Sequence, residues 1–238
     1  LCTACGPSGE GNTGGGDEDT LYLRLSTALQ STDWQQTAIM ESSKITYIQL
    51  FEGLYGMDES AGGYYNLLAK DVQLSEDNLT YTIELVDATF QNGDPLTAED
   101  VVFSYQLAME NPKFGYVTSM IDTVEAQGDK TVVVTLKFPY SAISHTFFTI
   151  KIYSKREYQE IVDSGVAFGT TPHTAGTGPY YVSEYDISAG VKLKAYENYW
   201  QGAPAIKNVE YRLITEDAAA VIAFENGELD YLIDAPLS

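Results

Sequence analysis

Cysteine and histidine, the residue types best suited to redox or metal chemistry, are rare in this 238-residue chain. Both cysteines, Cys2 and Cys5, lie near the start, and their Cys-x-x-Cys spacing is that of a redox pair. Such a pair is expected to follow a strand and to open a helix. Residues 6–19 instead contain six glycines and no large apolar residue, which is typical of a flexible tether. The sequence therefore disfavours a redox site, and the rest of the chain has no cysteine for a disulfide.

The two histidines, His145 and His173, are isolated from each other and from the cysteines. A structural or catalytic zinc ion usually needs three or four protein ligands, so these residues do not make a zinc site. Each is expected to be a surface histidine or one whose hydrogen bonds are satisfied. We predict no metal site and no cofactor.

Motifs that would carry enzymatic chemistry do not occur. The sequence has no Gly-x-Ser-x-Gly elbow, no His-Glu-x-x-His helix and no P-loop. Gly176-Thr177-Gly178 is not the start of a phosphate-binding G-x-G-x-x-G motif, because Tyr181 takes the place of the last glycine. If the protein were an enzyme, a carbohydrate hydrolase would be the alternative to consider, since a catalytic carboxylate pair could lie among the 34 Asp and Glu residues. We predict that the protein is not an enzyme and has no catalytic residues.

The charge of the chain excludes one class of partner. Thirteen Lys and Arg against 34 Asp and Glu give a net charge of −21, which repels phosphate backbones and anionic lipid headgroups. Nucleic acid is therefore not an expected partner. No run of about 18 apolar residues occurs, so no segment is expected to span a bilayer, and any membrane attachment would be covalent.

Residues 1–5 resemble the end of a bacterial lipoprotein signal peptide, in which small residues such as Thr3 and Ala4 precede a cysteine that becomes lipidated. This resemblance implies lipidation of Cys5, although Cys2 stands where such signals usually carry an aliphatic residue. A single acyl chain binds a membrane weakly, so a second chain or signal would be needed for firm attachment. A disordered leader without an anchor is the alternative.

Alternation of apolar and polar residues predicts most of the strands. Leu21, Leu23 and Leu25 alternate with polar residues and mark the first strand, at which the folded body begins. Further strands are expected at residues 79–85, 121–127 and 131–137, 180–185 and 191–196, and 209–214, several of them as hairpins. A last strand at residues 229–233 has no obvious partner, which suggests that the chain ends inside a fold.

Helical spacing and cap residues predict the helices. Apolar residues recur at helical spacing over about residues 37–55. Thr97 and Asp100 have the spacing of a capping box and open a helix that runs to about Glu110. Similar signals predict two later helices, one from Ser154 and Glu157 to Gly165 and one from Thr215 to Gly227.

Several blocks of the sequence carry a resemblance to a known family. They are residues 51–54 (Phe-Glu-Gly-Leu), 74–85, 90–104, 176–180, 197–204 and 224–230. In this order and spacing they resemble the family-5 extracellular solute-binding proteins, which are receptors of peptide and nickel ABC importers. The most distinctive, Asn92-Gly93-Asp94-Pro95 and residues 97–100, have a sufficient account as a turn and a helix cap. They therefore identify the fold and not a site.

The resemblance implies a periplasmic-binding-protein-like type II α/β fold, in which two lobes close around a ligand. This chain corresponds to the N-terminal lobe, a mixed sheet with an inserted α/β subdomain. We divide it into the signal end (residues 1–5), the tether (6–19), the first part of the lobe (20–56), the inserted subdomain (57–168) and the second part of the lobe (169–238). We expect the second lobe to be missing from these 238 residues.

The resemblance also implies the function. The protein is expected to be the extracellular substrate-binding component of an ABC importer, which captures oligopeptides or dipeptides and delivers them to permease subunits. It is expected to be a monomer at the cell surface or in the periplasm, attached to the membrane only by lipid. A nickel-chelate or oligosaccharide receptor of the same family and a surface ligand sensor are the alternatives.

The expected ligand-binding residues follow from the same resemblance. A bound peptide needs extended main chain to pair with and wet pockets for its side chains. Trp34 and Gln35 belong to a segment that resembles the one facing the cleft, and Tyr116 and Phe148 to segments that line it. Thr177, in the 176–178 turn, is a further candidate. For the aromatic residues, burial in the core is the alternative.

Overall fold

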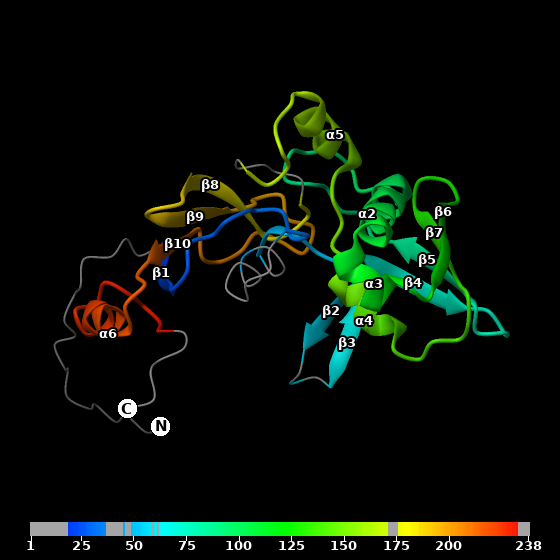
Figure 1. Cartoon of the computed structure of the whole chain (residues 1–238), viewed down its shortest axis with the longest axis horizontal. Helices are drawn as coiled ribbons and strands as arrows, with labels where there is room; N and C mark the ends of the chain where they lie inside the picture. Colours follow the sequence, from blue (N-terminus) through cyan, green and yellow to red (C-terminus); the bar gives the residue numbers. More distant parts are fainter. Residues whose placement is uncertain are drawn as a thin grey trace, which may run out of the picture.

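The computed structural model describes residues 19–36, 45, 49–58, 60, 62–170 and 176–232. Cys2, Cys5, His173 and all of the predicted tether except Asp19 lie outside these residues, as does most of the helix expected over residues 37–55. The described residues form two four-stranded sheets and one two-stranded hairpin. Figure 1 shows the two sheets apart along the long axis of the molecule, one in each half of the view.

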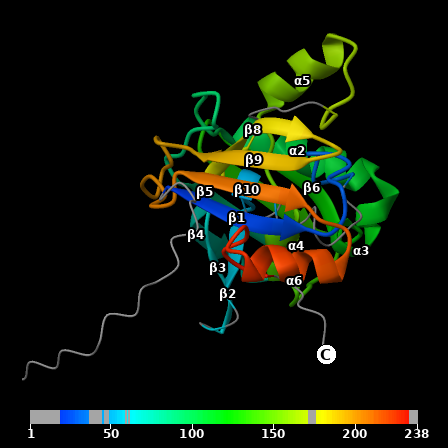
Figure 2. The ribbon, with the colours of Figure 1, turned by 90° about the vertical axis from the view of Figure 1, so that its left-hand side faces the viewer.

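The first sheet joins the beginning and the end of the described chain. Its strands are β1 (Thr20–Leu25), β8 (Tyr180–Asp186), β9 (Gly190–Ala195) and β10 (Asn208–Leu213). They lie side by side in the order β1-β10-β9-β8 (Figure 2). β8, β9 and β10 are antiparallel neighbours, whereas β1 pairs with β10 in parallel, so the mixed sheet predicted from the sequence is confirmed.

The second sheet consists of antiparallel hairpins covered by a helix. Its strands are β4 (Ala69–Leu74), β5 (Thr80–Leu85), β6 (Ile121–Ala126) and β7 (Thr131–Leu136), in the order β4-β5-β7-β6. The predicted β6–β7 hairpin is confirmed, with Gly128 in a left-handed conformation (φ 73°) that suits glycine. α2 (Ala98–Glu110) buries Val101, Tyr105 and Ala108 toward this sheet (Figure 1).

Shorter elements lie beside the second sheet. β2 (Tyr55–Asp58) and β3 (Gly63–Asn66) form a hairpin, which contacts α4 (Ile143–Thr149). The turn η2 (Pro112–Phe114) and α3 (Gly115–Thr118) follow α2, and α5 (Lys155–Asp163), which has no buried residue, stands apart from the sheets in Figure 1. None of the helices that the structure describes combines the length and apolar character needed to cross a bilayer.

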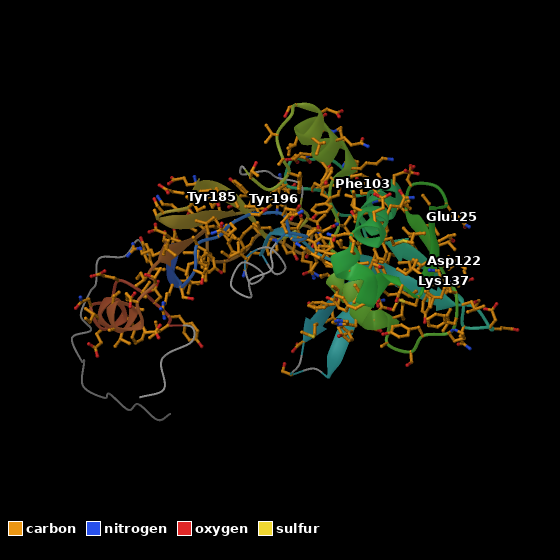
Figure 3. The ribbon with its side chains drawn as sticks, viewed as in Figure 1. Phe103, Asp122, Glu125, Lys137, Tyr185 and Tyr196 are labelled. Atoms are coloured by element: carbon orange, nitrogen blue, oxygen red, sulfur yellow. The ribbon has the colours of Figure 1, made fainter. Side chains whose placement is uncertain are left out.

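The two halves of the molecule share one hydrophobic core, to which both sheets contribute buried residues. Figure 3 places Phe103 in one half and Tyr185 and Tyr196 in the other. Tyr196 donates its hydroxyl hydrogen to the carbonyl of Phe90 (2.9 Å), which follows β5. The first sheet is therefore joined to the chain of the second sheet by a buried polar contact as well as by apolar packing.

The start of the last helix differs from the sequence prediction. Thr215 was expected to cap it, but α6 (Asp217–Glu225) begins after Glu216 and has no side-chain cap. Arg24 of β1, expected on a polar face, is buried beneath this helix. It donates to the carbonyl of Thr215 (3.2 Å) and to the Asp217 carboxylate (2.6 Å). This tertiary ion pair fixes the first turn, where a carboxylate also suits the helix dipole.

The segment near residue 230, whose partner the sequence left open, lies along the outer edge of β1. Tyr22 donates its amide hydrogen to the Asp230 carboxylate (2.7 Å), and Asp230 donates its own amide hydrogen to the carbonyl of Tyr22 (2.9 Å). Leu23 and Tyr231 form an isolated parallel bridge. The segment around residue 230 therefore covers part of the outer edge of β1.

The helix expected over residues 37–55 does not reach Tyr55. Ile45 is helical and residues 49–50 form a π-helical turn, but residues 51–52 are irregular and Tyr55 already begins β2. Gly53 forms an isolated bridge with Lys151, and a Cβ atom on Gly53 would lie 2.7 Å from the carbonyl oxygen of Phe147. Close packing of this backbone against the end of α4 therefore overrides the helical spacing of the side chains.

The capping box at the start of α2 is confirmed and leads to a prediction. The Asp100 carboxylate accepts from the Thr97 amide (2.9 Å) and hydroxyl (2.6 Å), and also from the Lys155 amide (2.9 Å) at the start of α5. Thr97→Ala is therefore expected to lower the free energy of unfolding by about 1 kcal/mol, measured by urea denaturation. Thr97→Ser keeps the hydroxyl and is the control. Equal stability of the two variants would show that the cap contributes nothing.

Candidate functional site

A cavity of about 240 Å³ lies between the β2–β3 hairpin, the end of α4 and the loop that follows β9. We call it the Glu52 cavity. Its walls are largely apolar and aromatic but contain one buried acid and one buried base. The lining residues are Phe51, Glu52, Gly56, Met57, Tyr65, Leu67, Phe148, Lys151, Pro179, Tyr199 and Gln201.

The Glu52 carboxylate is held by donors from two other parts of the chain. It accepts hydrogen bonds from the Tyr199 hydroxyl (2.5 Å) at one oxygen and from the Trp200 indole nitrogen (2.9 Å) at the other. Burial raises the pKa of Glu52, while these donors, the Thr177 hydroxyl and the nearby charge of Lys151 act to lower it. With 4% of its surface exposed, Glu52 is fixed in place and has both oxygens occupied.

Lys151 is the basic residue of the cavity and is 2% exposed. Its ammonium group donates to the carbonyl of Phe148 (2.8 Å) and lies 4.1 Å from the centre of the Phe148 ring. Burial lowers the pKa of Lys151 to about 7, and the charge of Glu52 opposes this shift. Lys151 can therefore change its charge near neutral pH, which is a property of groups at functional sites.

The turn at residues 176–178 forms part of the support behind the cavity. Gly178 donates its amide hydrogen to the carbonyl of Leu50 (3.0 Å), and Gln91 donates its amide hydrogen to the carbonyl of Gly176 (3.0 Å). The side-chain amide of Gln91 also donates to the carbonyls of Leu50, Gly178 and Tyr180 (3.2, 3.0 and 2.7 Å). These contacts fix the backbone on both sides of Thr177, whose buried side chain lies near Glu52.

The backbone contact at Gly176 leads to a second prediction. A Cβ atom on Gly176 would lie 1.9 Å from the carbonyl oxygen of Leu50, so backbone would have to move. Gly176→Ala is expected to lower the free energy of unfolding by about 1–3 kcal/mol, the usual cost of overpacking. Gly115→Ala, at a position where a Cβ atom would have nothing within 4 Å, is the control in the same thermal denaturation experiment. A Gly176 variant as stable as this control would contradict the close approach.

The open side of the cavity is aromatic. The Tyr65 ring of β3 crosses the backbone of Gly56, where an added Cβ atom would lie 2.3 Å from that ring. The Tyr65 residue is 48% exposed. Met57 is 44% exposed beside it. On the neighbouring surface Tyr64 hydrogen-bonds His145 of α4 (2.9 Å) and packs near the Phe148 ring. Such rings can cover the apolar part of a ligand while its polar groups meet water or the buried charges.

The structure brings two of the residues expected to bind ligand to this cavity and places three elsewhere. Phe148 lines the cavity, and Thr177 lies behind it next to Glu52. Trp34 is fully buried, packed against Tyr153 and Phe114, so its ring belongs to the core.

The other two candidates also lie away from the cavity. Gln35 is buried and accepts a hydrogen bond from Asn111 (3.2 Å). Tyr116 is 64% exposed and contacts the His145 ring, but it does not line the cavity. Neither residue lines the Glu52 cavity, and their place on the wall of a cleft stays a prediction.

Sequence reasoning missed the buried acid and base of the cavity and the donors that hold the acid. Glu52, Tyr199 and Trp200 stand in the blocks that carry the family resemblance, but they were used there only to identify the fold. Lys151 had a signal of its own, because it lies between Ile150 and Ile152 in an apolar stretch where a charged residue is unusual. Lys151 becomes a candidate site residue only because the fold places it near Glu52, which is 99 positions away in the sequence.

Two other cavities have charged walls whose side chains pair with each other. One, of about 290 Å³, lies at the β8–β9 turn, where Lys192 and Glu184 form an ion pair (2.7 Å). The other, of about 370 Å³, lies between the starts of α2 and α5, where Arg156 and Asp94 are paired. These ion pairs are at least partly exposed. The Glu52 cavity differs because its acid and base are both buried, and we take it as the candidate site.

Comparison with known proteins agrees with this description of the fold. Residues 63–238 match the family model described as "Bacterial extracellular solute-binding proteins, family 5 Middle". A protein of Brucella ovis named as an ABC transporter peptide-binding protein is 31% identical over 195 residues, which cover 79% of this chain and 36% of that protein. The chain thus spans little more than a third of the length of this relative.

Solved structures show the same fold. The oligopeptide-binding protein AppA of Bacillus subtilis, in complex with a nonapeptide, superposes with a TM-score of 0.81 at 22% identity, over 90% of this chain and 43% of that one. MoaA of A. tumefaciens R10, in complex with mannopinic acid, gives a TM-score of 0.80 at 26% identity, over 90% and 44%. The predicted fold class is confirmed, as one part of a longer architecture. This chain belongs to family 5 of the bacterial extracellular solute-binding proteins.

Proposed function

We propose that this chain is part of the extracellular substrate-binding component of an ABC importer, which captures oligopeptides or dipeptides and delivers them to permease subunits in the membrane. The observation that carries the proposal is the Glu52 cavity, which combines aromatic walls with a buried acid and base. The peptide-binding name of the Brucella ovis relative supports the choice of ligand.

The size of the cavity indicates how much of a ligand it would hold. Its volume of about 240 Å³ is below the ~300–1,000 Å³ of cavities that enclose a whole small ligand. It would therefore take one end or one side chain of a peptide. The remaining contacts would come from the rest of the full-length protein, because the chain covers only 43% of the length of the AppA structure.

The proposed domain boundaries are those predicted from the sequence. Residues 20–56 and 169–238 would form the lobe, with residues 57–168 as its inserted subdomain, and a second lobe outside this chain would close over the ligand. Phe148 and Thr177 remain proposed site residues, now joined by Tyr65, Lys151 and Tyr199. Lipidation of Cys5 would hold the protein, as a monomer, at the outer face of the membrane.

A binding screen tests this function. The full-length protein would be heated with pools of di- to pentapeptides, with nickel–histidine complexes and with oligosaccharides, and its melting temperature recorded. A ligand that binds only the folded state raises the melting temperature by mass action. We expect a rise with peptides and no chemical change in them. A rise only with nickel complexes or sugars would overturn the peptide assignment, and conversion of a bound peptide to product would overturn the function as a receptor.

A further inference from the structure

Met57 is the most exposed methionine that the structure describes, and it lies on the wall of the candidate site. It belongs to β2 and lines the Glu52 cavity together with Tyr65 and Phe148. With 44% of the residue exposed, Met57 is open to small solutes as well as to a ligand. The cavity wall therefore carries a thioether, an apolar group that peroxides convert into a polar one.

The other methionines that the structure describes are protected by the core. Met120 is 3% exposed, and its sulfur lies 4.0 Å from the Thr146 hydroxyl oxygen. Met109 of α2 is partly buried and packs against the hydrophobic core. Met40 lies outside the described residues. Because an oxidant must reach the sulfur atom, oxidation from solvent is expected at Met57 before Met109 and Met120.

We infer that Met57 is a site of reversible oxidation by hydrogen peroxide, and that its sulfoxide weakens ligand binding at the Glu52 cavity. The inference rests on the proposed function, because it concerns the regulation of the same site. In the reaction the Met57 sulfur attacks one peroxide oxygen and the O–O bond breaks. The sulfoxide and one molecule of water form, so that sulfur loses two electrons and the peroxide gains them. A dithiol reductase reverses the step, because it releases the sulfoxide oxygen as water and forms a disulfide.

The sulfoxide would change the aromatic side of the cavity, which covers apolar ligand groups. Met57 pairs with Tyr64 across the β2–β3 hairpin, and the centre of the Tyr64 ring lies 5.8 Å from that of Phe148. A thioether packs favourably against such rings, whereas a sulfoxide oxygen is a polar acceptor that loses its water when a ligand covers it. The ligand affinity of the oxidised protein is therefore expected to be about tenfold lower, at the low end of the cost of burying an unpaired polar group.

The test treats the full-length protein with hydrogen peroxide and follows each methionine by mass spectrometry of its digest. We expect Met57 to gain an oxygen atom several times faster than Met109 and Met120. Retention of the pool of di- to pentapeptides by the oxidised wild type should fall about tenfold and recover after treatment with a methionine sulfoxide reductase.

Met57→Leu is the matched control, because leucine has a similar volume but no sulfur to oxidise. Its retention of the peptide pool should be the same before and after peroxide treatment. Cys2, Cys5 and Met40 are unchanged in this variant, so the comparison also controls for their oxidation.

The outcomes separate the inference from the function on which it rests. Oxidation of Met57 no faster than that of Met109 and Met120 overturns the modification site and leaves peptide capture standing. Unchanged retention by a wild type oxidised at Met57, or an equal loss in Met57→Leu, overturns the regulation. If the untreated wild type retains no peptide, peptide capture and its regulation both fail, and the order of oxidation still decides the modification site.

Discussion

Replacing Glu52 with alanine is expected to lower the free energy of unfolding by about 3–5 kcal/mol at neutral pH, the usual effect of breaking a buried charge network by removing one partner. The change would leave the Trp200 indole and the Tyr199 hydroxyl without their shared acceptor. It would also remove the opposite charge that acts on the Lys151 ammonium. Each of these groups is at least partly buried, so water would compensate only in part.

Urea denaturation of the two proteins at pH 7 measures this effect, with Glu197→Ala as the matched control. Glu197 pairs with Lys207 (3.1 Å) on the surface, where both side chains are well exposed, so its removal should cost less than about 1 kcal/mol. A Glu52 variant no less stable than the Glu197 variant would show that the network makes no net contribution to stability.

Lys151→Met is expected to change how stability depends on pH. The unfolded chain holds the Lys151 proton up to its ordinary pKa of 10.5, whereas the folded protein releases it at about pH 7. Between these values the unfolded state binds more protons, so the wild type becomes more stable as pH rises. Relative to Lys151→Met, its free energy of unfolding should rise by up to about 1.4 kcal/mol per pH unit between pH 7 and 10.

The comparison is made by urea denaturation at several pH values, because groups shared by the two proteins largely cancel in the difference. Lys155→Met is the control, since Lys155 is on the surface of α5 and its removal should leave the slope unchanged. Parallel stability curves for the wild type and Lys151→Met would show that the folded protein does not hold Lys151 with a lowered pKa.

Sequence patterns correctly predicted the elements that depend on residues close together in the sequence. The capping box of Thr97 and Asp100 and the hairpin turn at Gly128 depend on residues a few positions apart, and both are observed. Two predictions were wrong because contacts with residues far away in the sequence decide where these helices end or begin. The helix over residues 37–55 ends early because Gly53 packs on the end of α4, and α6 starts at Asp217 because Arg24 of β1 reaches it.

The candidate site was harder to predict for the same reason. Resemblance pointed to Phe148 and Thr177, which lie at the Glu52 cavity, and also to Trp34, which is in the core. The candidate site is built on Glu52 and Lys151, which line one cavity although the whole second sheet lies between them in the sequence. Lys151 stands out in the sequence as a charged residue in an apolar stretch, but its place beside Glu52 in one cavity is encoded by no spacing rule.

The parallel pairing of β1 with β10 has a consequence for the order of events during synthesis. Arg24 and its partner Ile214 are 190 positions apart, although they lie together at one edge of the first sheet. At ribosomal rates of roughly 5–20 residues per second, β1 would wait about 10–40 s for its neighbour to emerge. The second sheet is complete in sequence well before then. β1 is thus made long before the other strands of the first sheet, which leaves an interval in which it lacks its neighbours.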